Sequence, residues 1–354
     1  MIQDEFDKEK MEQIKSEKIK TIILETIPGF LSNIEILEYI GSGSESEVYK
    51  VLIKDTKKFV ALKFIFSSED KMINNPKINF SSKLKHKNII NFYAYDEIKR
   101  NELYCMIMEH GKFGNMFNFL NKCIQRNYFS ETILCFFSYQ ILQGIQHCHK
   151  NKICHMDIKP QNIVIDEHLI PKLIDFSISF DYSNLNNISN AKIKLPFVGT
   201  SLFMSPEIIL QKYILIKDIN KIDLYSFGVT LYLLGYGHYP YSFGIDDVKN
   251  YNNIIKKINS GLNLNKERRI FSSAFMDFLR KLLESNINKR INIEQALNHY
   301  WIKGADILMQ EKEKINNRNN FLAYLIMDHF HTFEEYLKNY NKVVTIGFLR
   351  KGIK

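Results

Sequence analysis

The apolar residues of this 354-residue chain change their spacing near residue 110. From Asn33 to His110 they fall in short runs rich in β-branched and aromatic residues, a pattern typical of strands. Beyond Gly111 they recur mainly at helical spacing. We therefore expect an α+β fold, in which a strand-rich small lobe is followed by a larger, mainly helical lobe with a cleft between them.

Five runs in the first region predict strands of a small antiparallel sheet. They are "IEILEYI", "EVYKVLI", "FVALKFIF", "IINFYAYDEI" and "LYCMIMEH". One short helix is expected among them, at "NNPKINFSSKLKH", where Asn75 can cap the helix and Pro76 suits its first position.

Four segments of the second region predict helices. Ser130 and Glu131 open a helix whose apolar face holds Leu134, Phe137, Ile141, Ile145 and Cys148. "DLYSFGVTLYLLGYG" is apolar nearly all round, which indicates a buried central helix. "SSAFMDFLRKLLES" and "NIEQALNHYWI" are expected to form one helix each.

The chain divides by composition into three parts. Residues 1–32 are a charged extension with a weak helical stripe, residues 33–302 form the main domain (33–110 and 111–302), and residues 303–354 are an extension expected to be partly helical. Both extensions are candidate docking segments for a regulatory partner. An alternative to a function in the main domain is that these extensions are themselves the functional part, as docking or autoinhibitory helices.

Charge and cysteine content bound the class of protein. The net charge of +9 comes from scattered lysines rather than from one dense patch, so we expect no nucleic-acid partner. The five cysteines show no metal-binding spacing and read as buried thiols of a reducing compartment. No signal peptide or membrane-spanning run is seen, and we expect an intracellular protein, cytoplasmic or nuclear.

A glycine-containing turn between the first two strands can approach a ligand closely. In "IGSGSESEV", Gly41 and Gly43 lack the side chains that would block such an approach. Lys63 lies in the next strand, inside the apolar run "FVALKFIF", where a buried ammonium group needs an anion. Taken alone, the glycine-containing turn could be an ordinary turn between strands. Taken alone, Lys63 could be an edge-strand lysine that reaches solvent.

The segment "HMDIKPQNIVID" places a base, a cation and an amide on one short loop. Phosphoryl transfer needs a carboxylate to position the attacking hydroxyl, a cation for the phosphate charge and oxygen ligands for Mg²⁺. Asp157 and Lys159 offer the first two groups. Asn162 and Asp175, each beside an apolar strand-like run, offer oxygens for the metal.

Together these motifs resemble those of the eukaryotic protein kinases, serine/threonine type, over roughly Asn33 to Ile302. The resemblance implies a two-lobed protein-kinase-like fold, ATP and Mg²⁺ as cofactors and a protein substrate. It implies that Asp157 is the catalytic base, that Lys159 and Lys63 contact phosphate, and that Asn162 and Asp175 are metal ligands. It also implies a nucleotide site formed by Ile40, Gly41, Ser42, Gly43, Ser44, Glu45, Ser46, Glu47, Val48, Ala61, Lys63, Met108, Glu109, His110, Gly111 and Val164.

Further motifs extend the resemblance into the second half of the chain. "GTSLFMSPE" resembles the end of a kinase activation segment, with Glu207 expected to pair with Arg290. Asp223 resembles the buried aspartate that braces the catalytic loop. Asn115 and Gln161 stand where kinases that prefer arginine near the target residue often carry glutamate, so no strong preference for basic motifs is expected.

Three substitutions depart from the family pattern without removing a reacting group. Ser46 replaces the third glycine of the nucleotide loop, and Ser177 gives "DFS" in place of "DFG". Met156 replaces the arginine that grips a phosphate on the activation segment, so activation by that route is not expected. Ser183, Ser189 and Tyr182 are candidate phosphorylation sites on this segment.

The last departure concerns the partner of Lys63. The small-lobe position that usually holds its glutamate partner is Lys77. Two facing lysines would repel, so we expect Lys77 to point away and Lys63 to pair with another acid, Asp175 being the nearest expected one. The alternative to an active enzyme is a pseudokinase scaffold with weak or no phosphotransfer.

Overall fold

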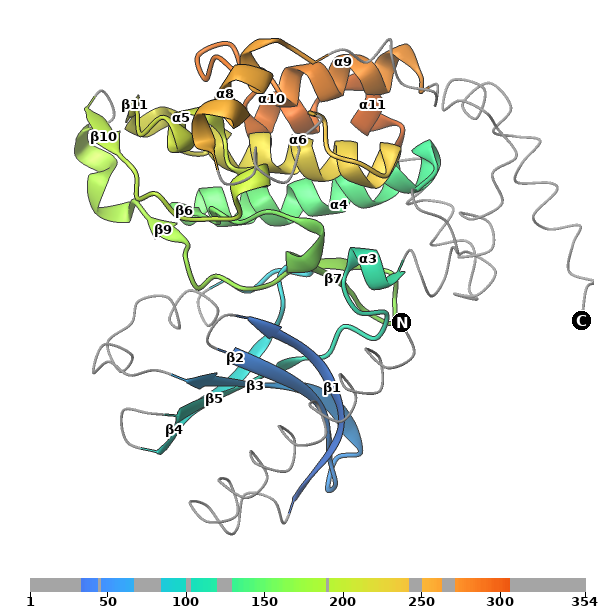
Figure 1. Ribbon diagram of the computed structural model, residues 1–354. Helices are drawn as coiled ribbons and strands as arrows, with labels where there is room; N and C mark the ends of the chain where they lie inside the picture. The colour runs from blue at the N-terminus through green and yellow to red at the C-terminus, as the bar shows by residue number, and fades with distance from the viewer. Residues whose placement is uncertain are drawn as a thin grey trace, which may run out of the picture. The chain divides into compact units, whose positions relative to one another are not determined.

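The computed structural model describes residues 33–43, 46–66, 84–99, 103–119, 129–188, 191–241, 250–262 and 271–305. These divide into two compact units (Figure 1). The smaller unit contains residues 33–85 and Ile90–Lys112, and the larger unit contains His86–Ile89 and residues 113–305. The extensions at 1–32 and 306–354, and the helix expected at Asn75, lie outside the described residues.

The smaller unit is a five-stranded antiparallel sheet with the strand order β1-β2-β3-β5-β4. The strands span Ile34–Gly43 (β1), Ser46–Ile53 (β2), Lys58–Phe66 (β3), Phe92–Lys99 (β4) and Leu103–Glu109 (β5). All five strands predicted from the apolar runs are therefore confirmed.

One face of this sheet is closely packed. Alternate residues of β2, β3 and β5 pack together on it, and Tyr49, Leu62 and Phe64 are at most 1% exposed. Because successive side chains of a strand point to opposite faces, the intervening residues Val48, Ala61 and Lys63 lie together on the other face. The strand pattern thus separates a packing face from a face that carries the predicted nucleotide-site residues.

The larger unit is built on two long helices, α4 (Glu131–Lys150) and α6 (Lys221–Tyr236), which contact each other (Figure 1). The side chain of Ser130 accepts a hydrogen bond from the Ile133 N–H and begins α4, as predicted. Helix α6 is buried along nearly its whole length and ends at Gly237, whose φ of 80° is the left-handed conformation that glycine adopts easily. The buried central helix expected from "DLYSFGVTLYLLGYG" is confirmed.

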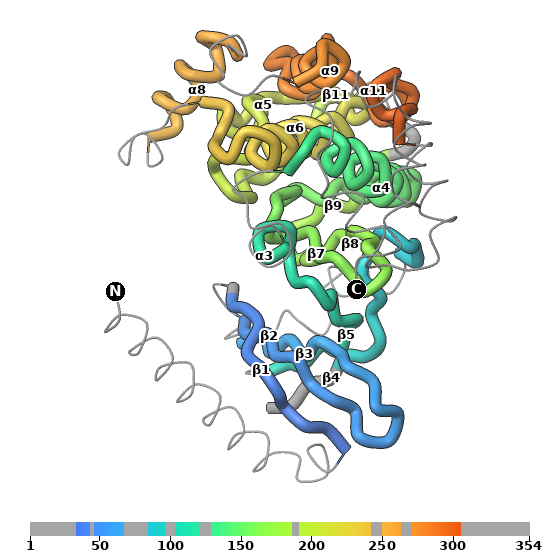
Figure 2. The backbone as a smooth tube through the Cα atoms, turned by 90° about the vertical axis from the view of Figure 1, so that its right-hand side faces the viewer, coloured from blue at the N-terminus to red at the C-terminus, as the bar shows by residue number. Residues whose placement is uncertain are grey.

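Shorter elements complete the larger unit (Figure 2). The remaining α-helices are α3 (Met116–Phe119), α5 (Pro206–Ile209), α8 (Tyr251–Asn259), α9 (Ser273–Leu282), α10 (Ile293–Leu297) and α11 (Tyr300–Lys303). Two-stranded antiparallel sheets pair β6 (Ile153–Cys154) with β9 (Phe180–Asp181), β7 (Ile163–Ile165) with β8 (Pro171–Leu173), and β10 (Lys192–Lys194) with β11 (Tyr213–Leu215). Short 3₁₀-helices lie at Pro160–Asn162, Ser183–Ile188, Ser201–Phe203 and Ile216–Asp218.

One helix expectation was wrong in its extent. "NIEQALNHYWI" forms two helices, α10 and α11, in place of one. His299 has extended backbone (ψ 138°) between them, and its side chain accepts a hydrogen bond from the Trp301 N–H, so it caps the second helix. Trp301 is thereby turned into the core, where its indole N–H donates to the buried Glu131 carboxylate. Among the described helices, none is both long and apolar enough to cross a membrane.

Candidate functional site

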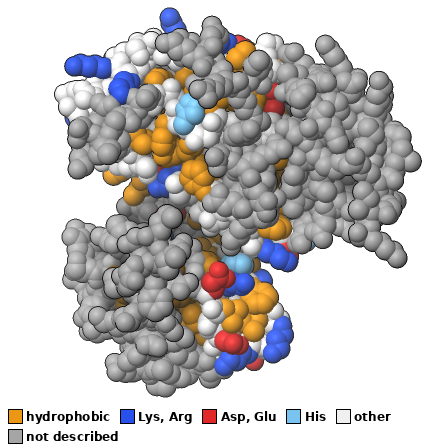
Figure 3. All heavy atoms as spheres, turned by 45° about the vertical axis from the view of Figure 1, so that its right-hand side comes forward, with side chains coloured by type: hydrophobic (Ala, Val, Ile, Leu, Met, Phe, Trp, Pro, Cys, Tyr) orange, Lys and Arg blue, Asp and Glu red, His pale blue; other side chains and the backbone are white. Residues whose placement is uncertain are grey.

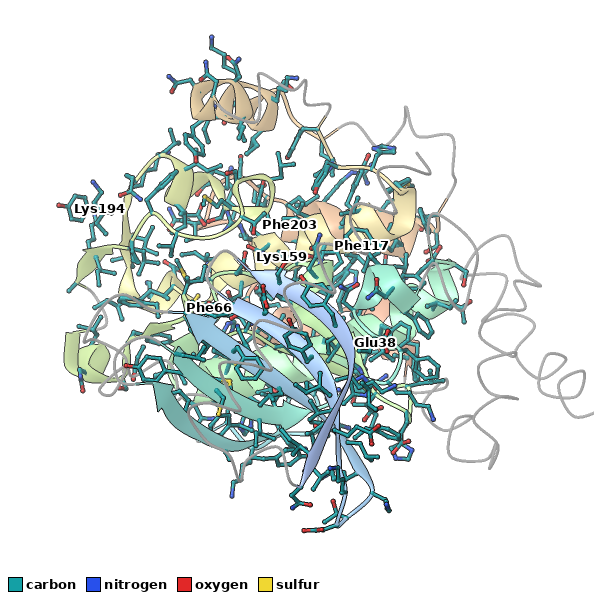
Figure 4. All side chains as sticks on the ribbon, turned by 60° about the horizontal axis from the view of Figure 1, so that its bottom comes forward. Glu38, Phe66, Phe117, Lys159, Lys194 and Phe203 are labelled. Atoms are coloured by element: carbon teal, nitrogen blue, oxygen red, sulfur yellow. The ribbon has the colours of Figure 1, made fainter. Side chains whose placement is uncertain are left out.

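The loop between β6 and β7 carries the polar residues that the sequence singled out. It begins after Cys154, passes Asp157 and Lys159, and closes with the helical turn Pro160–Asn162 that leads into β7. Pro160 opens this turn, in the position where its missing N–H costs nothing. Figure 4 labels Lys159 of this loop and Phe203, which ends the helical turn that directly follows Thr200.

The carboxylate of Asp157 is hydrogen-bonded at both oxygens. One oxygen accepts from the amide nitrogen of Asn162 at 2.8 Å and lies 2.7 Å from the ammonium nitrogen of Lys159. The other accepts from the backbone N–H and the hydroxyl of Thr200, at 3.1 and 2.8 Å. With three partners around it and 11% of its side chain exposed, Asp157 is fixed in position while it keeps an opening to solvent.

Thr200 joins the loop to the activation segment. Its hydroxyl donates to Asp157 and accepts from the ammonium group of Lys159 at 2.7 Å. From the sequence, Thr200 was expected to mark the serine/threonine type together with Lys159 and the "GTSLFMSPE" pattern, and its bridging position was not predicted. The structure thus brings Asp157, Lys159, Asn162 and Thr200 into one hydrogen-bonded cluster.

Glycine is required directly before Thr200. Gly199 has a φ of 117°, and a Cβ atom added there would lie 2.9 Å from the backbone oxygen of Met156. Met156 itself has a φ of 69°, an uncommon conformation for a non-glycine residue. The close contact between these two backbones is what allows Thr200 to reach Asp157.

A buried carboxylate holds the start of the loop. Asp223, at the first turn of α6, accepts hydrogen bonds from the backbone N–H groups of His155 and Met156, both at 2.9 Å. It also lies 2.8 Å from Nε2 of the buried His149 on α4. Burial alone would raise the pKa of Asp223, but its hydrogen bond and its attraction to His149, with the contribution of His155, hold that pKa below its ordinary value. The bracing role expected for Asp223 is matched by this geometry, whereas His149 was not singled out from the sequence.

The β7–β8 pair places the two predicted metal ligands near each other. Asn162 precedes β7 and Asp175 follows β8, and the Ile174 N–H donates to the backbone oxygen of Asn162 at 3.0 Å. The side-chain nitrogen of Asn162 is engaged by Asp157, which leaves its amide oxygen as the atom able to face a metal ion. Asp175 has a φ of 63°, a strained conformation of the kind that functional sites retain. An amide oxygen and a carboxylate fit the oxygen ligands that Mg²⁺ prefers.

Within the smaller unit, the predicted nucleotide residues share one sheet face. Val48 lies opposite Gly41 on β1 and opposite Lys63 on β3, and Ala61 lies opposite Met108 on β5. Directly paired residues of an antiparallel sheet point to the same face. A Cβ atom added at Gly41 would meet no atom within 4 Å, so the chain itself leaves the space above this glycine open.

The other predicted nucleotide residues are placed as follows. Ile40, Ser42 and Gly43 end β1, Ser46 and Glu47 begin β2, and Glu109 ends β5 ahead of His110 and Gly111. Val164 is in β7 of the larger unit. Ser44, Glu45 and Lys77 lie outside the described residues, so the expected orientation of Lys77 stays a prediction.

The end of the activation segment is fixed by an ion pair that the sequence predicted. Both carboxylate oxygens of Glu207 contact the Arg290 guanidinium, at 2.5 and 3.0 Å. The two residues are 5% and 2% exposed, so neither charge has water as a partner. This pair confirms the expected partnership of Glu207 with Arg290.

The middle of the activation segment contains one wrong candidate. Tyr182 is 4% exposed, and its hydroxyl donates to the backbone oxygen of His149 and contacts the Asn220 side chain. Burial raises its pKa far above the ordinary value. A residue held in this way is not a phosphorylation site in the folded chain. Ser183 is partly buried, and Ser189 lies outside the described residues.

Comparison with known proteins identifies one family. The model of the protein kinase domain matches residues 34–302. Serine/threonine-protein kinase SRK2A of Physcomitrium patens is 30% identical over 270 residues, covering 75% of this chain and 73% of that protein. Serine/threonine-protein kinase SAPK2 of Oryza sativa subsp. japonica is 28% identical over 289 residues, covering 81% of each chain.

Other relatives are much longer than the matched region. Myosin-IIIa of Mus musculus is 27% identical over 304 residues, which cover 83% of this chain and 18% of that protein. NUAK family SNF1-like kinase 1 of Homo sapiens is 29% identical over 273 residues, which cover 76% of this chain and 38% of that protein. The chain therefore spans about a fifth to two fifths of the length of these two relatives.

Proposed function

We propose that this chain, which belongs to the protein kinase domain family, is a serine/threonine protein kinase that transfers the γ-phosphoryl group of MgATP to a hydroxyl group of a protein substrate. The observation that carries the proposal is the cluster in which Asp157 is held by Lys159, Asn162 and Thr200. Two relatives that match most of the chain are serine/threonine-protein kinases by name, which supports the choice of acceptor.

In this proposal Asp157 positions the attacking hydroxyl and receives its proton as the new phosphorus–oxygen bond forms, while the bond from the γ-phosphorus to the bridging oxygen breaks and ADP leaves. Its hydrogen bonds to Thr200 and Asn162 orient the carboxylate before substrate arrives, so little reorganisation is needed during the reaction. Lys159 lies next to both Asp157 and Thr200, where its charge balances the charge that develops on the transferred group.

ATP supplies the γ-phosphoryl group when bound, and Mg²⁺ neutralises phosphate charge. For this chain, the amide oxygen of Asn162 and the carboxylate of Asp175 would hold the metal ion. Gly41, Val48 and Ala61 would lie against the nucleotide, and Lys63 would contact its phosphates. Support for these assignments comes from the open space above Gly41 and from the shared face of Val48, Ala61 and Lys63.

We further propose that activity does not depend on a phosphate bound by the catalytic loop. Met156 is 4% exposed and belongs to an apolar cluster with Leu195, Met204 and Ile208. Partly buried apolar residues of the activation segment, Ile178, Phe180 and Val198, pack against the same cluster. Apolar packing therefore takes the place that a cation would need in order to grip a phosphate.

An intracellular location belongs to the proposal as well. The described cysteines Cys105, Cys135, Cys148 and Cys154 are all buried, which suits the thiols of a reducing compartment. The terminal extensions remain proposed docking segments for a regulatory partner.

A phosphotransfer assay with labelled ATP and Mg²⁺ tests the proposal. The chain should label mixed serine/threonine-containing peptides or itself, and phosphoamino-acid analysis should recover phosphoserine or phosphothreonine. The variant Asp157→Asn should lose at least about 100-fold in rate while keeping its nucleotide-induced thermal shift, because general base and positioning effects are of that order. Equal, background-level transfer by both proteins would contradict the proposal, and a retained thermal shift would then identify a nucleotide-binding scaffold.

A further inference from the structure

The end of the activation segment and the elements around it carry an unusual distribution of charge. From Tyr182 to Leu262, the described residues contain the carboxylates of Glu207, Asp218 and Asp223, and all three are buried. Their partners are internal, namely Arg290, Lys221 and His149. The exposed charged residues of the same described stretch are lysines: Lys192, Lys194, Lys212, Lys217 and Lys256.

The small sheet formed by β10 and β11 presents several of these lysines together. Lys192 lies opposite Leu215, Ile193 opposite Ile214, and Lys194 opposite Tyr213. Ile193 and Ile214 pack into the apolar cluster that contains Met156, so this face of the sheet is its inner one. The pleat then places Lys192, Lys194 and Tyr213 on the outer face.

Aromatic side chains continue this outer face toward α8. Tyr213 is 68% exposed, the largest value among the exposed large apolar residues described. Phe197 is 40% exposed and packs edge-on against Tyr251, the first residue of α8, with 4.9 Å between ring centroids. We name the surface of Lys192, Lys194, Phe197, Lys212, Tyr213 and Tyr251 the basic aromatic face. Figure 1 shows β10, β11, α5 and α8 gathered at one end of the larger unit.

Asp181, which directly precedes Tyr182, is exposed, but no described ion pair joins it to this face. Lys192, Lys194 and Lys212 have no ion pair in the described part of the chain, whereas Lys221 and Lys281 elsewhere in the unit do. Figure 4 labels Lys194 at the outer edge of the unit, away from the helical core. In Figure 3 basic side chains of the larger unit lie beside hydrophobic ones. Such a surface matches a partner that is acidic and carries apolar groups.

We infer that the basic aromatic face binds an acidic segment of the protein substrate, an inference that rests on the proposed function. Lys194 and Thr200 are six residues apart, which an extended chain spans in about 20 Å. Acidic residues within roughly six positions of the target hydroxyl would therefore reach Lys194, and those within roughly eight positions would reach Lys192. Apolar residues among them would pack on Phe197 and Tyr213. The neutral Asn115 and Gln161 agree with this preference, because neither attracts a basic motif.

Binding of labelled peptides, followed by fluorescence anisotropy without ATP, tests the inference independently of catalysis. Three peptides of equal length carry alanine at the acceptor position and acidic, neutral or basic flanks. The full chain should bind the acidic peptide roughly tenfold more tightly than the neutral one, and 0.5 M salt should remove most of the difference.

Matched charge reversals locate the binding surface. The double variant Lys192→Glu, Lys194→Glu should lose roughly tenfold in affinity for the acidic peptide, as expected when two exposed attractive pairs become repulsive. The control Lys289→Glu, Lys303→Glu carries the same change in net charge at two exposed lysines of the same unit and should change affinity less than about twofold. If the two lysine-to-glutamate changes reduce expression, the double variant Lys192→Gln, Lys194→Gln replaces them. It should lose about threefold in affinity for the acidic peptide, because it removes the attraction without adding repulsion.

Three outcomes would overturn the inference. They are equal affinity for the three peptides, equal losses in the two double variants, and binding to phosphatidylserine-containing vesicles without binding to acidic peptide. Phosphotransfer to a neutral serine peptide, measured separately, reports on the proposed function alone. The acidic preference can therefore fail while kinase activity stands, or hold in a chain that lacks activity.

Discussion

At the scale of single residues, Asp157 depends on neighbours that are far away in sequence. The two groups that reach one of its oxygens both belong to Thr200, 43 positions later. The backbone of Gly199 permits this approach, because any side chain there would collide with the Met156 carbonyl. The position of the Asp157 carboxylate therefore depends on Gly199, because this residue has no side chain.

Gly199→Ala should reduce phosphotransfer by at least about tenfold with a modest effect on folding. The strain of a positive φ costs on the order of 1–3 kcal/mol, and relief of the clash with Met156 moves Thr200 away from Asp157. Gly261→Ala is the matched control, because Gly261 also has a positive φ (84°) but a Cβ atom there would meet nothing within 4 Å. Comparable losses of kcat in the two variants would contradict the account.

His86 should make the larger unit sensitive to acid. Burial, followed by the nearby His147 and Lys87, lowers the pKa of His86 from 6.5 to about 4. Its ring also stacks on His147, and its Nδ1 accepts a hydrogen bond from the Asn88 N–H, which requires the unprotonated atom. Since the folded pKa lies below the unfolded one, this contribution is fully present above about pH 6.5 and is lost as the pH falls toward 4.

The matched variant for this prediction is His86→Asn. An asparagine side chain can accept the same hydrogen bond from the residue two positions on, but it does not titrate in this range. Urea unfolding midpoints between pH 7.5 and 4.5 should fall more steeply for the original chain than for the variant. Parallel pH profiles would show that His86 does not carry the expected linkage.

At the scale of elements, one residue of α6 joins three parts of the chain. Asp223 accepts from the two N–H groups at the start of the catalytic loop and pairs with His149 of α4. It is fully buried, so no water replaces a lost partner. The loop therefore keeps its shape because two helices that pack together supply its anchor.

Asp223→Ala should destabilise the chain by about 3–5 kcal/mol, the usual cost of leaving buried partners of an ion pair unsatisfied. Asp277→Ala provides the comparison, because Asp277 also contacts a lysine and a histidine but is 40% exposed in its side chain. Its loss should cost less than about 1 kcal/mol. Urea denaturation of both variants measures the difference, and similar costs would contradict the anchoring role of Asp223.

The same scale shows what the sequence could and could not predict. The strands and long helices follow from apolar spacing, which is clearest in β2 and β3, where one face is buried, and in α6, where nearly all of the surface is buried. The break between α10 and α11 did not follow, since it depends on the His299 side chain bonding to the Trp301 backbone and on Trp301 reaching Glu131. The local sequence pattern does not indicate contacts between residues 170 positions apart, such as that of Trp301 with Glu131.

At the scale of the whole molecule, the candidate site was predictable in its members and less so in its connections. Asp157, Lys159 and Asn162 were found because their spacing within one loop is informative. His149 was missed because a lone histidine on an apolar helix face gives no signal of its partner 74 positions later. The partner of Lys63 stays a prediction, since Lys77 lies outside the described residues.

In this structure apolar packing and the hydrogen bonds of Thr200 with Asp157 and Lys159 join the loop to the activation segment, where the family often uses a phosphate and an arginine. Met156 lies in the cluster that also receives Ile178, Phe180 and Val198, and Thr200 bonds directly to Asp157. In the described residues, the activation segment is also paired with β11 through β10. We therefore expect the site to be assembled before any residue is modified.

The most direct test is phosphotransfer by the chain after phosphatase treatment, with mass spectrometry to verify that no phosphate remains on residues 175–207. The initial rate should be within about twofold of the untreated chain, while Asp157→Asn measured in the same way stays at background, at least about 100-fold lower. A treated chain that is inactive until residues 175–207 are phosphorylated again would contradict the account.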